Sequence, residues 1–410
     1  MPTDKTPHPG LFARYRRLSL GTRILLWMIL GILAGIAFGH EATLVAPLGQ
    51  LFIRLLMMAA IPLVFFNLLA GITSLSDIRS LGRLGLKIGA FYSITTATAL
   101  TLGLITMNWL RPGVGLSLRQ PVNDEVGNLP RLQDVILELV PGNVFEAFSA
   151  GRMIQVVVFA LLLGIATLML PSPEQRRLRD LFDLLTRLMR QLVELILRLS
   201  PIGIAALAAA MIGEHGSAIF GPMTTFIVGV WGAQATMVLF YLLLLYGFTR
   251  RSPWKFLKLS ASLYATTAAT CSSLASLVVS LDIAEKKLHL PRSIYSFTLP
   301  LGAQMNKDGT SIMLAGVLVM TAQATGIEFS LGSQVTIILV GLLLSTGAGG
   351  IPGSGLVTAM IFVQAFNLPL EIAAMVGGIY RLIDMGSTTV NCMGDLVGTT
   401  IVSDSESAAG

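Results

Sequence analysis

Three carboxylates and one lysine stand in stretches of this sequence that are otherwise apolar. Lys307 and Asp308 are adjacent in "GAQMNKDGTSIML", while Asp384 and Asp395 lie in "YRLIDMGSTTVNCMGDLVGTT". A charge inside a membrane span is costly, and by default it marks the path of an ion or a substrate. Carboxylate oxygens suit hard cations, and they also pair with a substrate ammonium. These residues therefore predict a site for a cation, an amine, or both.

The second stretch has helical spacing. Asp384, Thr388, Asn391 and Asp395 stand at i, i+4, i+7 and i+11, which share one face of a helix. The alternative to a binding site is that this helix face lines a water-filled cavity or makes polar contacts with another helix.

Another stripe of charged residues alternates in sign near a basic loop, and we interpret it as a salt-bridged helix face: Arg187, Arg190, Glu194 and Arg198. Arg54 stands alone in the second predicted span, and we assign it no role. Snorkelling, in which a long side chain extends its charge to the membrane surface, is the ordinary explanation for its presence.

The composition indicates an integral membrane protein. The 410 residues are 54% hydrophobic and 12% charged, whereas a soluble domain carries roughly 25% charged residues. Apolar runs of about 20 residues, long enough to cross a bilayer, recur along the chain. The net charge of +6 comes from Lys and Arg gathered in a few loops, which follows the positive-inside rule and predicts no nucleic-acid partner.

Alternating basic and less basic loops predict a multi-pass topology in the inner (plasma) membrane. Residues 1–22 and 403–410 are expected in the cytoplasm. Eight spans are predicted at 23–40, 47–76, 84–111, 131–171, 180–212, 221–248, 292–325 and 369–402. Residues 252–286 lie between two basic clusters, so we predict a re-entrant hairpin there. A second hairpin is predicted at 330–366, because "TGAGGIPGSG" breaks it into two halves too short to span.

Broken hairpins of this kind are typical of secondary transporters, where they form sites near the bilayer midplane. The alternative is that the glycine-rich breaks serve helix packing. An ion channel is a further alternative. An enzyme is not expected, because the histidines all fall at or outside the membrane edge: His8, His40, His215 and His289. Cys271 and Cys392 lie in apolar segments and suggest no disulfide framework.

Four motifs resemble the dicarboxylate/amino acid:cation symporters, the family of glutamate/aspartate and neutral amino acid transporters. "NKDGT" (306–310) is similar to that family's Asn-Met-Asp-Gly-Thr motif, and "GAGGIPGSG" (347–355) to its second hairpin tip. "DMGSTTVNCMGDLVGTTIV" resembles its last helix, and "YSITT" (92–96) a polar patch in its third span. The serine-rich "TCSSLAS" (270–276) sits where the family's first hairpin tip would be, but it lacks that family's run of three serines. The resemblance covers essentially the whole chain, in order.

The resemblance implies an all-α homotrimer in the lipid bilayer that works as an elevator. A scaffold domain would comprise residues 23–76 and 131–212, and a transport domain 84–111 and 221–402. The two hairpins would serve as gates. By position, Asp384 would hold the substrate amino group, and Asn391 and Thr388 its main-chain carboxylate. By the same resemblance, the substrate pocket would be completed by the backbone near Ser273, by Thr310, and by the second hairpin tip from Ile351 to Gly355.

Sodium is the coupling ion that the resemblance implies, held by shells of oxygen atoms that suit an alkali cation. One site would comprise Asp395, Asn391 and the carbonyls of Gly302 and Asn306. Another would comprise Tyr92, Thr95, Thr96, Asn306 and Asp308. A third would use carbonyls around Gln304 and those of Ser345, Thr346 and Ala348.

Two departures from the family pattern bear on function. Ser387 stands where acidic amino acid transporters place an arginine, so we expect a small neutral amino acid such as serine, threonine or alanine. Lys307 stands where the motif has methionine, and our hypothesis is that its ammonium replaces at least one sodium ion. The alternatives are that Lys307 turns away, or that it binds an anionic group of an acidic amino acid or C4-dicarboxylate and so compensates for the missing arginine.

Overall fold

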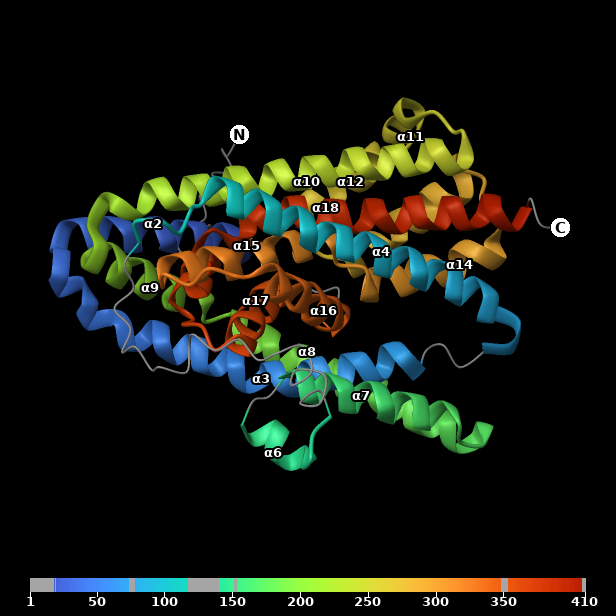
Figure 1. Ribbon diagram of the computed structural model, residues 1–410, viewed down its shortest axis with the longest axis horizontal. Coiled ribbons are helices and arrows are strands. Elements are labelled where there is room, and N and C mark those ends of the chain that lie inside the picture. Colours follow the sequence, from blue (N-terminus) through green and yellow to red (C-terminus); the bar gives the residue numbers. More distant parts are fainter. Residues whose placement is uncertain are drawn as a thin grey trace, which may run out of the picture.

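The computed structural model describes residues 18, 20–73, 78–116, 140–150, 153–347 and 353–407, and the regular elements within these ranges are all helical. Figure 1 shows them as an elongated bundle, with most long helices running along the longest axis. The first half comprises α2 (Leu20–Phe38), η1 (Gly39–Val45), α3 (Ala46–Thr73), α4 (Ile78–Leu110), α6 (Val144–Ser149), α7 (Met153–Leu168), α8 (Ser172–Leu197), α9 (Ser200–His215) and η3 (Gly216–Ile219). The second half comprises α10 (Phe220–Thr249), α11 (Pro253–Leu259), α12 (Ala261–Thr270), α13 (Ser273–Asp282), η4 (Ile283–Lys287), α14 (Arg292–Met305), α15 (Asp308–Ala324), α16 (Leu331–Gly347), α17 (Ser354–Ala365) and α18 (Glu371–Ser407).

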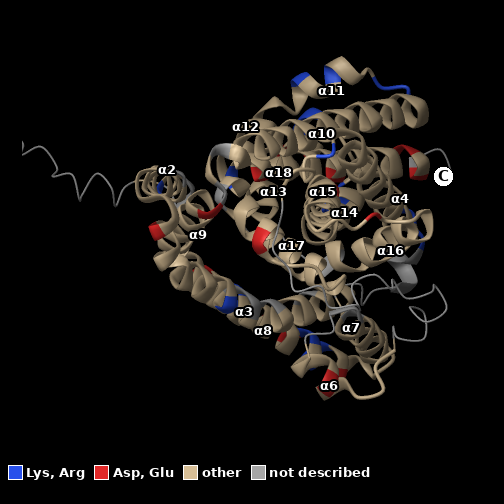
Figure 2. Cartoon of the chain, turned by 60° about the vertical axis from the view of Figure 1, so that its left-hand side comes forward, with Lys and Arg blue, Asp and Glu red and all other residues tan. Residues whose placement is uncertain are grey.

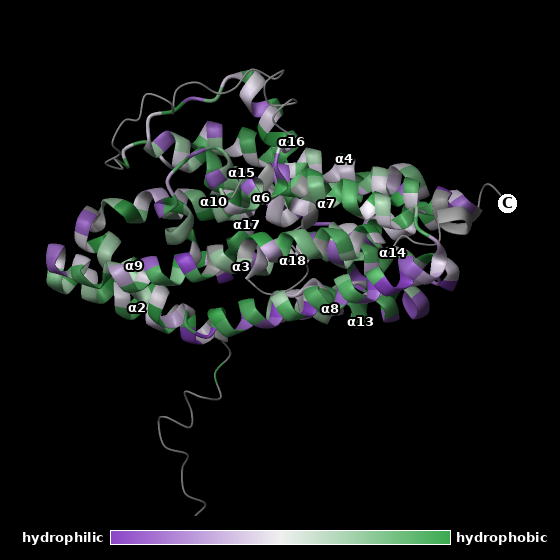
Figure 3. Cartoon of the chain, turned by 90° about the horizontal axis from the view of Figure 1, so that it is seen from below, coloured by the Kyte–Doolittle hydropathy of each residue, from purple (hydrophilic) through white to green (hydrophobic). Residues whose placement is uncertain are grey.

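Several stretches are long and apolar enough to cross a membrane. They are Thr22–Leu55, Arg83–Leu110 and Phe220–Thr249, and α8 and α9 meet the same requirement together across a bend of 53°. Figure 2 shows few charged residues along most of the helices, and Figure 3 shows hydrophobic residues along most of them. Many large hydrophobic side chains are exposed, and such a surface suits lipid and not water. The predicted count of eight spans stays a prediction.

Some boundaries differ from those expected. The span predicted at 180–212 is a bent pair of helices, because Pro201 stands at the start of α9 and cannot continue the hydrogen-bond ladder of α8. Within the span predicted at 131–171, the described helices are α6 and α7, and residues 131–139 lie outside the described residues.

The expected hairpins are present as pairs of short helices. In the first, α12 ends where Cys271 adopts a left-handed conformation (φ 50°), and the Ser272 side chain caps α13 by accepting a hydrogen bond from the Ala275 amide at 3.2 Å. In the second, α16 and α17 flank the glycine-rich segment, of which residues 348–352 lie outside the described residues. Gly353, at φ 84°, takes a left-handed conformation before α17, where a side chain would be strained.

The helices fall into two groups by packing. Helices α2, α3, α7, α8 and α9 pack mainly on one another, while α15 packs against α4, α10, α17 and α18. α15 is buried over nearly its whole length, which places its polar first turn inside protein. The assignment of these groups to a scaffold domain and a moving transport domain stays a prediction.

The C-terminal helix continues past the predicted end of the last span. α18 runs to Ser407, whereas the span itself was predicted to end at residue 402. Ion pairs hold its last turns: Arg251 donates to the Asp404 carboxylate at 2.8 and 3.0 Å, and Lys87 donates to Glu406 at 2.7 Å. Arg83 also pairs with Glu406. These partners from α4 and the α10–α11 loop stabilise the helical structure beyond residue 402.

We expect acid to weaken this attachment. Hydrogen bonds from Lys87 and Arg83 hold the pKa of Glu406 below its usual value of 4.5. A carboxyl whose pKa is lower in the folded state contributes stability above its unfolded pKa, and loses it as the pH falls through the folded value. Glu406→Gln should therefore lower the midpoint of thermal unfolding slightly at neutral pH, with a difference that vanishes in acid below the usual carboxyl range. A constant difference across a pH series would contradict this assignment.

Candidate functional site

The Asp308 carboxylate lies at the first turn of α15, fully buried, and is held by two hydroxyl groups. Thr96 on α4 donates to one carboxylate oxygen at 2.5 Å, and Tyr241 on α10 donates to the other. Asn306, at ψ 117°, is extended and separates α14 from α15. The break brings Asp308 to a helix N-terminus, where a negative charge is favourable. Tyr241 was missed by the sequence analysis, because it follows an apolar run without a polar neighbour.

A second carboxylate, Asp395, is joined to the same break by amide side chains. The Asn306 side-chain amide donates to Asp395 at 3.0 Å and to the Asn391 carbonyl at 3.0 Å. Asn391 in turn accepts from the Gly309 amide at 2.8 Å and donates to the Thr310 hydroxyl at 3.3 Å. The Asn391 and Asp395 part of the stripe on α18 therefore meets the broken segment between α14 and α15.

The close approach of Gly302 to this cluster leaves no room for a side chain. A Cβ atom there would lie 2.3 Å from the Tyr92 hydroxyl and 2.5 Å from an Asp395 carboxylate oxygen. Tyr92 donates to the Thr298 carbonyl at 3.2 Å, and Thr95 to the Tyr92 carbonyl at 3.2 Å. These residues of α4 and α14 therefore line the same buried region as Asp395 and Asp308.

The donor set around Asn306 fits a cation such as sodium. Its side-chain oxygen is buried and, among the described residues, has no hydrogen-bond partner. An unpaired buried oxygen is costly, and a bound cation beside Asp395 would remove that cost. Asn306, Asp395 and the Tyr92 region are thus the residues that would hold a coupling cation, which would contribute a charge balancing the carboxylates.

Lys307 lies inside this region and does not turn away. Its side chain is 2% exposed, and its Nζ donates to the carbonyl oxygens of Ala303 at 2.8 Å and Asn306 at 3.1 Å. Its charge interacts with Asp395 and, more weakly, with Asp308. The predicted use of the Asn306 carbonyl as a sodium ligand is thus opposed by the lysine that already binds that oxygen.

Asp384 forms a separate group about 16 Å along α18 from Asp395, given eleven residues at 1.5 Å each. It is 5% exposed and accepts a hydrogen bond from Thr388 at 3.3 Å. Tyr380, one turn earlier, lies beside it and reaches hairpin 2, where a Cβ on Gly355 would come within 2.5 Å of the tyrosine hydroxyl and 3.0 Å of Thr310. Asp384, Thr388, Thr310 and Gly355 therefore lie close together, and their role in substrate binding stays a prediction.

Arg381 is a cation at this end of the site that the sequence analysis did not single out. Its guanidinium donates to the Ala269 carbonyl at 2.6 Å and approaches the Thr270 carbonyl at 3.4 Å, at the tip of hairpin 1. Its charge also interacts with Asp384 and with Cys271. The sequence signal that could have found it is its position three residues before Asp384, on the same helix face.

Three further residues that the sequence singled out make other contacts, and their predicted roles stay predictions. The Ser387 hydroxyl donates to the Gly309 carbonyl at 3.1 Å and accepts from Gln234 at 2.9 Å, so it joins α18 to α15 and α10. The Gln304 side chain accepts from Arg190 of α8 at 3.0 Å, so Arg190 also reaches beyond its predicted salt-bridged stripe. Ser273 is buried at the start of α13.

The third predicted cation site is described only in part. The Ser345 hydroxyl donates to the Leu342 carbonyl at 3.2 Å, an ordinary contact within α16. Thr346 belongs to α16, but its side chain is not described. Ala348 and Ile351 lie outside the described residues. The carbonyl site beneath hairpin 2 therefore stays a prediction.

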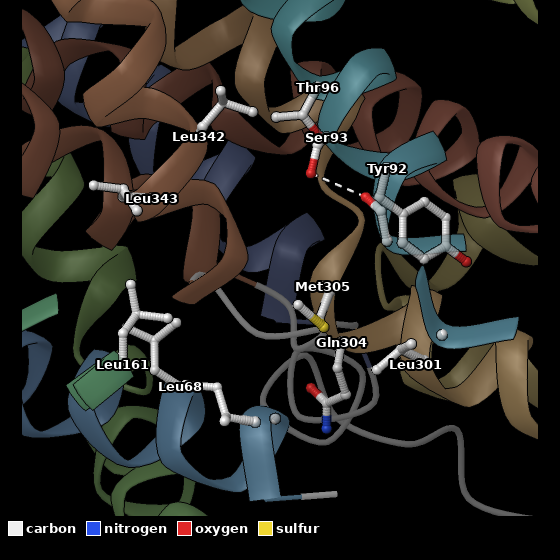
Figure 4. Close-up of a pocket in the computed structure, with 14 residues that line it drawn as sticks. Leu68, Tyr92, Ser93, Thr96, Leu161, Leu301, Gln304, Met305, Leu342 and Leu343 are labelled. Carbon is white, nitrogen blue, oxygen red and sulfur yellow. Dashed lines mark hydrogen bonds between the residues drawn. The ribbon is translucent and has the colours of Figure 1, made fainter. Parts of the chain in front are cut away.

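A cavity of about 330 Å³ lies beside the Asp308 cluster and not at Asp384. Figure 4 shows Leu68, Leu161 and Leu342 on one side of it, with Tyr92 and Thr96 of α4 on the other. Its wall is mainly apolar, and helices of both packing groups contribute to it. It therefore separates α3 and α7 from the carboxylate region and does not itself offer an anion or amine site.

Residues 20–405 match the family model described as "Sodium:dicarboxylate symporter family". The chain belongs to this family. It is 30% identical over 402 residues to a C4-dicarboxylate transport protein of Bacillus subtilis (strain 168), covering 95% of this chain and 94% of the relative.

Further members of the sodium:dicarboxylate symporter family match over similar lengths. A proton/glutamate-aspartate symporter of Bacillus subtilis (strain 168) is 29% identical, with 94% of each chain covered. A proton/sodium-glutamate symport protein of Geobacillus stearothermophilus is 28% identical, covering 95% of this chain and 94% of the relative. The chain is therefore an integral membrane protein of a cation-coupled symporter family, a family of transporters and not of enzymes.

Proposed function

We propose that this symporter carries a small dicarboxylic anion, with an acidic amino acid such as aspartate or glutamate as the preferred substrate. The observation that carries the proposal is Arg381, whose guanidinium lies beside Asp384 at the tip of hairpin 1. We expected a neutral amino acid because Ser387 carries no positive charge to pair with a substrate carboxylate. Arg381 can supply that positive charge instead. The names of the similar proteins, C4-dicarboxylate and glutamate-aspartate transporters, support the same class.

The two charges at this end of the site match a molecule that carries both an ammonium and a second carboxylate. Asp384 offers a buried acceptor for the ammonium, and Arg381 offers a fork of donors that suits a carboxylate. Asn391 and Thr310, which hydrogen bond to each other, would orient the main-chain carboxylate. A C4-dicarboxylate lacks the ammonium and would leave Asp384 without its partner, so we place it second.

One observation favours a neutral amino acid as an alternative substrate, which we place third. The Arg381 guanidinium already donates to two carbonyl groups of hairpin 1. If these contacts persist when substrate binds, the guanidinium holds the gate closed and leaves no donor for a substrate carboxylate. Serine would then be bound in preference to aspartate.

Uptake by purified protein in liposomes tests these candidates. Unlabelled aspartate, succinate and serine should compete with labelled aspartate in that order of strength. Arg381→Gln should weaken aspartate binding about 10- to 100-fold, because a hydrogen bond to a charged group contributes about 1.5–3 kcal/mol, and should affect serine much less. Arg54→Gln, at an exposed arginine of α3, is the matched control and should change neither. Equal loss for serine and aspartate would assign Arg381 to the hairpin alone.

The finer architecture belongs to the same proposal. We infer eight spans with both termini cytoplasmic, a homotrimer formed through residues 23–76 and 131–212, and hairpins that gate a moving transport domain. The separate packing of the two helix groups supports the division. Sodium or protons would be the coupling cation, as both occur in the names of similar proteins.

A further inference from the structure

We propose that the Lys307 ammonium is a resident cation that permanently occupies one cation position of the transport site. The chain would then couple one fewer external cation than a relative with an uncharged residue at this position. The stoichiometry of coupling rests on the proposed function, whereas the occupation of the site by lysine does not.

The geometry of Lys307 is that of an ion held by backbone oxygens. Its side chain folds back from the start of α15, and Nζ donates to the Ala303 and Asn306 carbonyls at 2.8 and 3.1 Å. Ala303 is in the last turn of α14, whose final carbonyl groups have no amide partner within the helix, and Asn306 is the residue that caps this end. The C-terminal end of a helix also carries partial negative charge. The site therefore offers the features that would hold a free cation, and an ammonium is already there.

The surrounding charges also favour an ammonium at this position. Asp395 and Asp308 both interact with the ammonium, and Arg190 of α8 is the described cation that opposes it. Both carboxylates are buried, so neither is balanced by solvent. A second cation at the same carbonyls would have to displace Nζ, because the two like charges could not share oxygens at these distances.

The lysine does not fill the whole region. The Asn306 side-chain oxygen faces no hydrogen-bond donor among the described residues, whereas the Asn306 main-chain oxygen accepts from Nζ. The main-chain oxygen of Asn306 is thus bound by the lysine, while its side-chain oxygen is open to a cation. We therefore expect the chain to lose one cation position and to keep the rest of its cation coupling.

A sodium titration of the purified full-length protein without substrate tests this directly. The midpoint of thermal unfolding is measured as NaCl replaces choline chloride at constant ionic strength, because an ion that binds only the folded protein raises its stability. Lys307→Met and Lys307→Gln should each reach half-maximal stabilisation at a sodium concentration at least about tenfold lower than the native chain. Lys286→Met removes an exposed lysine paired with Asp282 and should titrate like the native chain.

The outcomes separate a resident cation from a simple helix cap. A cap alone predicts that both variants are less stable by the same amount at every sodium concentration, and this result would overturn the proposal. So would variants that fail to fold even in high sodium, since sodium should restore the missing charge. As a second readout, the slope of log substrate affinity against log sodium concentration should rise by about one in the variants. If the substrate proposal fails, the titration without substrate still decides this one.

Discussion

Gly309→Ala is expected to lower the free energy of unfolding by about 3 kcal/mol, near the upper end for overpacking, and to abolish transport. A Cβ atom at this position would lie 2.4 Å from the Ser387 carbonyl oxygen and 2.6 Å from the Ser387 Cα. Both are main-chain atoms of α18, so no side-chain rotation can relieve the clash. The two helices must separate, and the Gly309–Asn391 hydrogen bond of 2.8 Å, which joins them at the site, must lengthen or break.

The measurement is the midpoint of thermal unfolding in detergent, together with uptake into liposomes. Gly316→Ala is a matched control on the same buried helix, since a Cβ there meets only side-chain atoms of Phe226 and Met107, at 3.1 Å or more. These side chains can shift, so the control should lose much less stability and keep transport. Equal effects of the two substitutions would show that α15 is sensitive to any added methyl group and not to its contact with α18.

Tyr241→Phe is expected to lower the free energy of unfolding by about 2 kcal/mol, because it leaves a buried carboxylate without one of its donors. Tyr241 is fully buried, and its hydroxyl donates to Asp308 while the neighbouring oxygen accepts from Thr96 at 2.5 Å. The ring itself stays in place, since phenylalanine has the same shape. The loss should therefore report the hydrogen bond and not a cavity.

Cation binding should change in the same variant. With fewer donors on Asp308, its negative charge is less compensated, so stabilisation by a cation near the break should increase relative to the native chain. Tyr246→Phe is the control, on the same helix but 50% exposed, and should change neither stability nor cation response. Combining Tyr241→Phe with Thr96→Val measures whether the two hydroxyls act together on Asp308. A loss for Tyr241→Phe no larger than for Tyr246→Phe would remove Tyr241 from the site.

The sequence by itself determined the class of protein and the positions of its two hairpins. An excess of apolar residues with few charges can only be accommodated by a membrane, and glycine, proline and extended positions act locally on the backbone. The hairpins at 252–286 and 330–366 were therefore predictable from the residues at those places, whereas the interruption at Asn306 falls inside a span predicted to run from 292 to 325. The stripe from Asp384 to Asp395 was predictable because helical periodicity is a local property.

Only the tertiary structure decided which charged groups act together. Tyr241 on α10 and Arg381 on α18 meet their partners, Asp308 and the hairpin 1 tip, across 67 and 111–112 residues of sequence. Such contacts depend on how helices pack, which no single segment specifies. Packing likewise placed Ser387 between helices, and it brought the positive charge of Arg381 to the Asp384 end of the site instead. It also directed Lys307 back onto the carbonyls of α14, because the break leaves those oxygens unpaired where water cannot reach them.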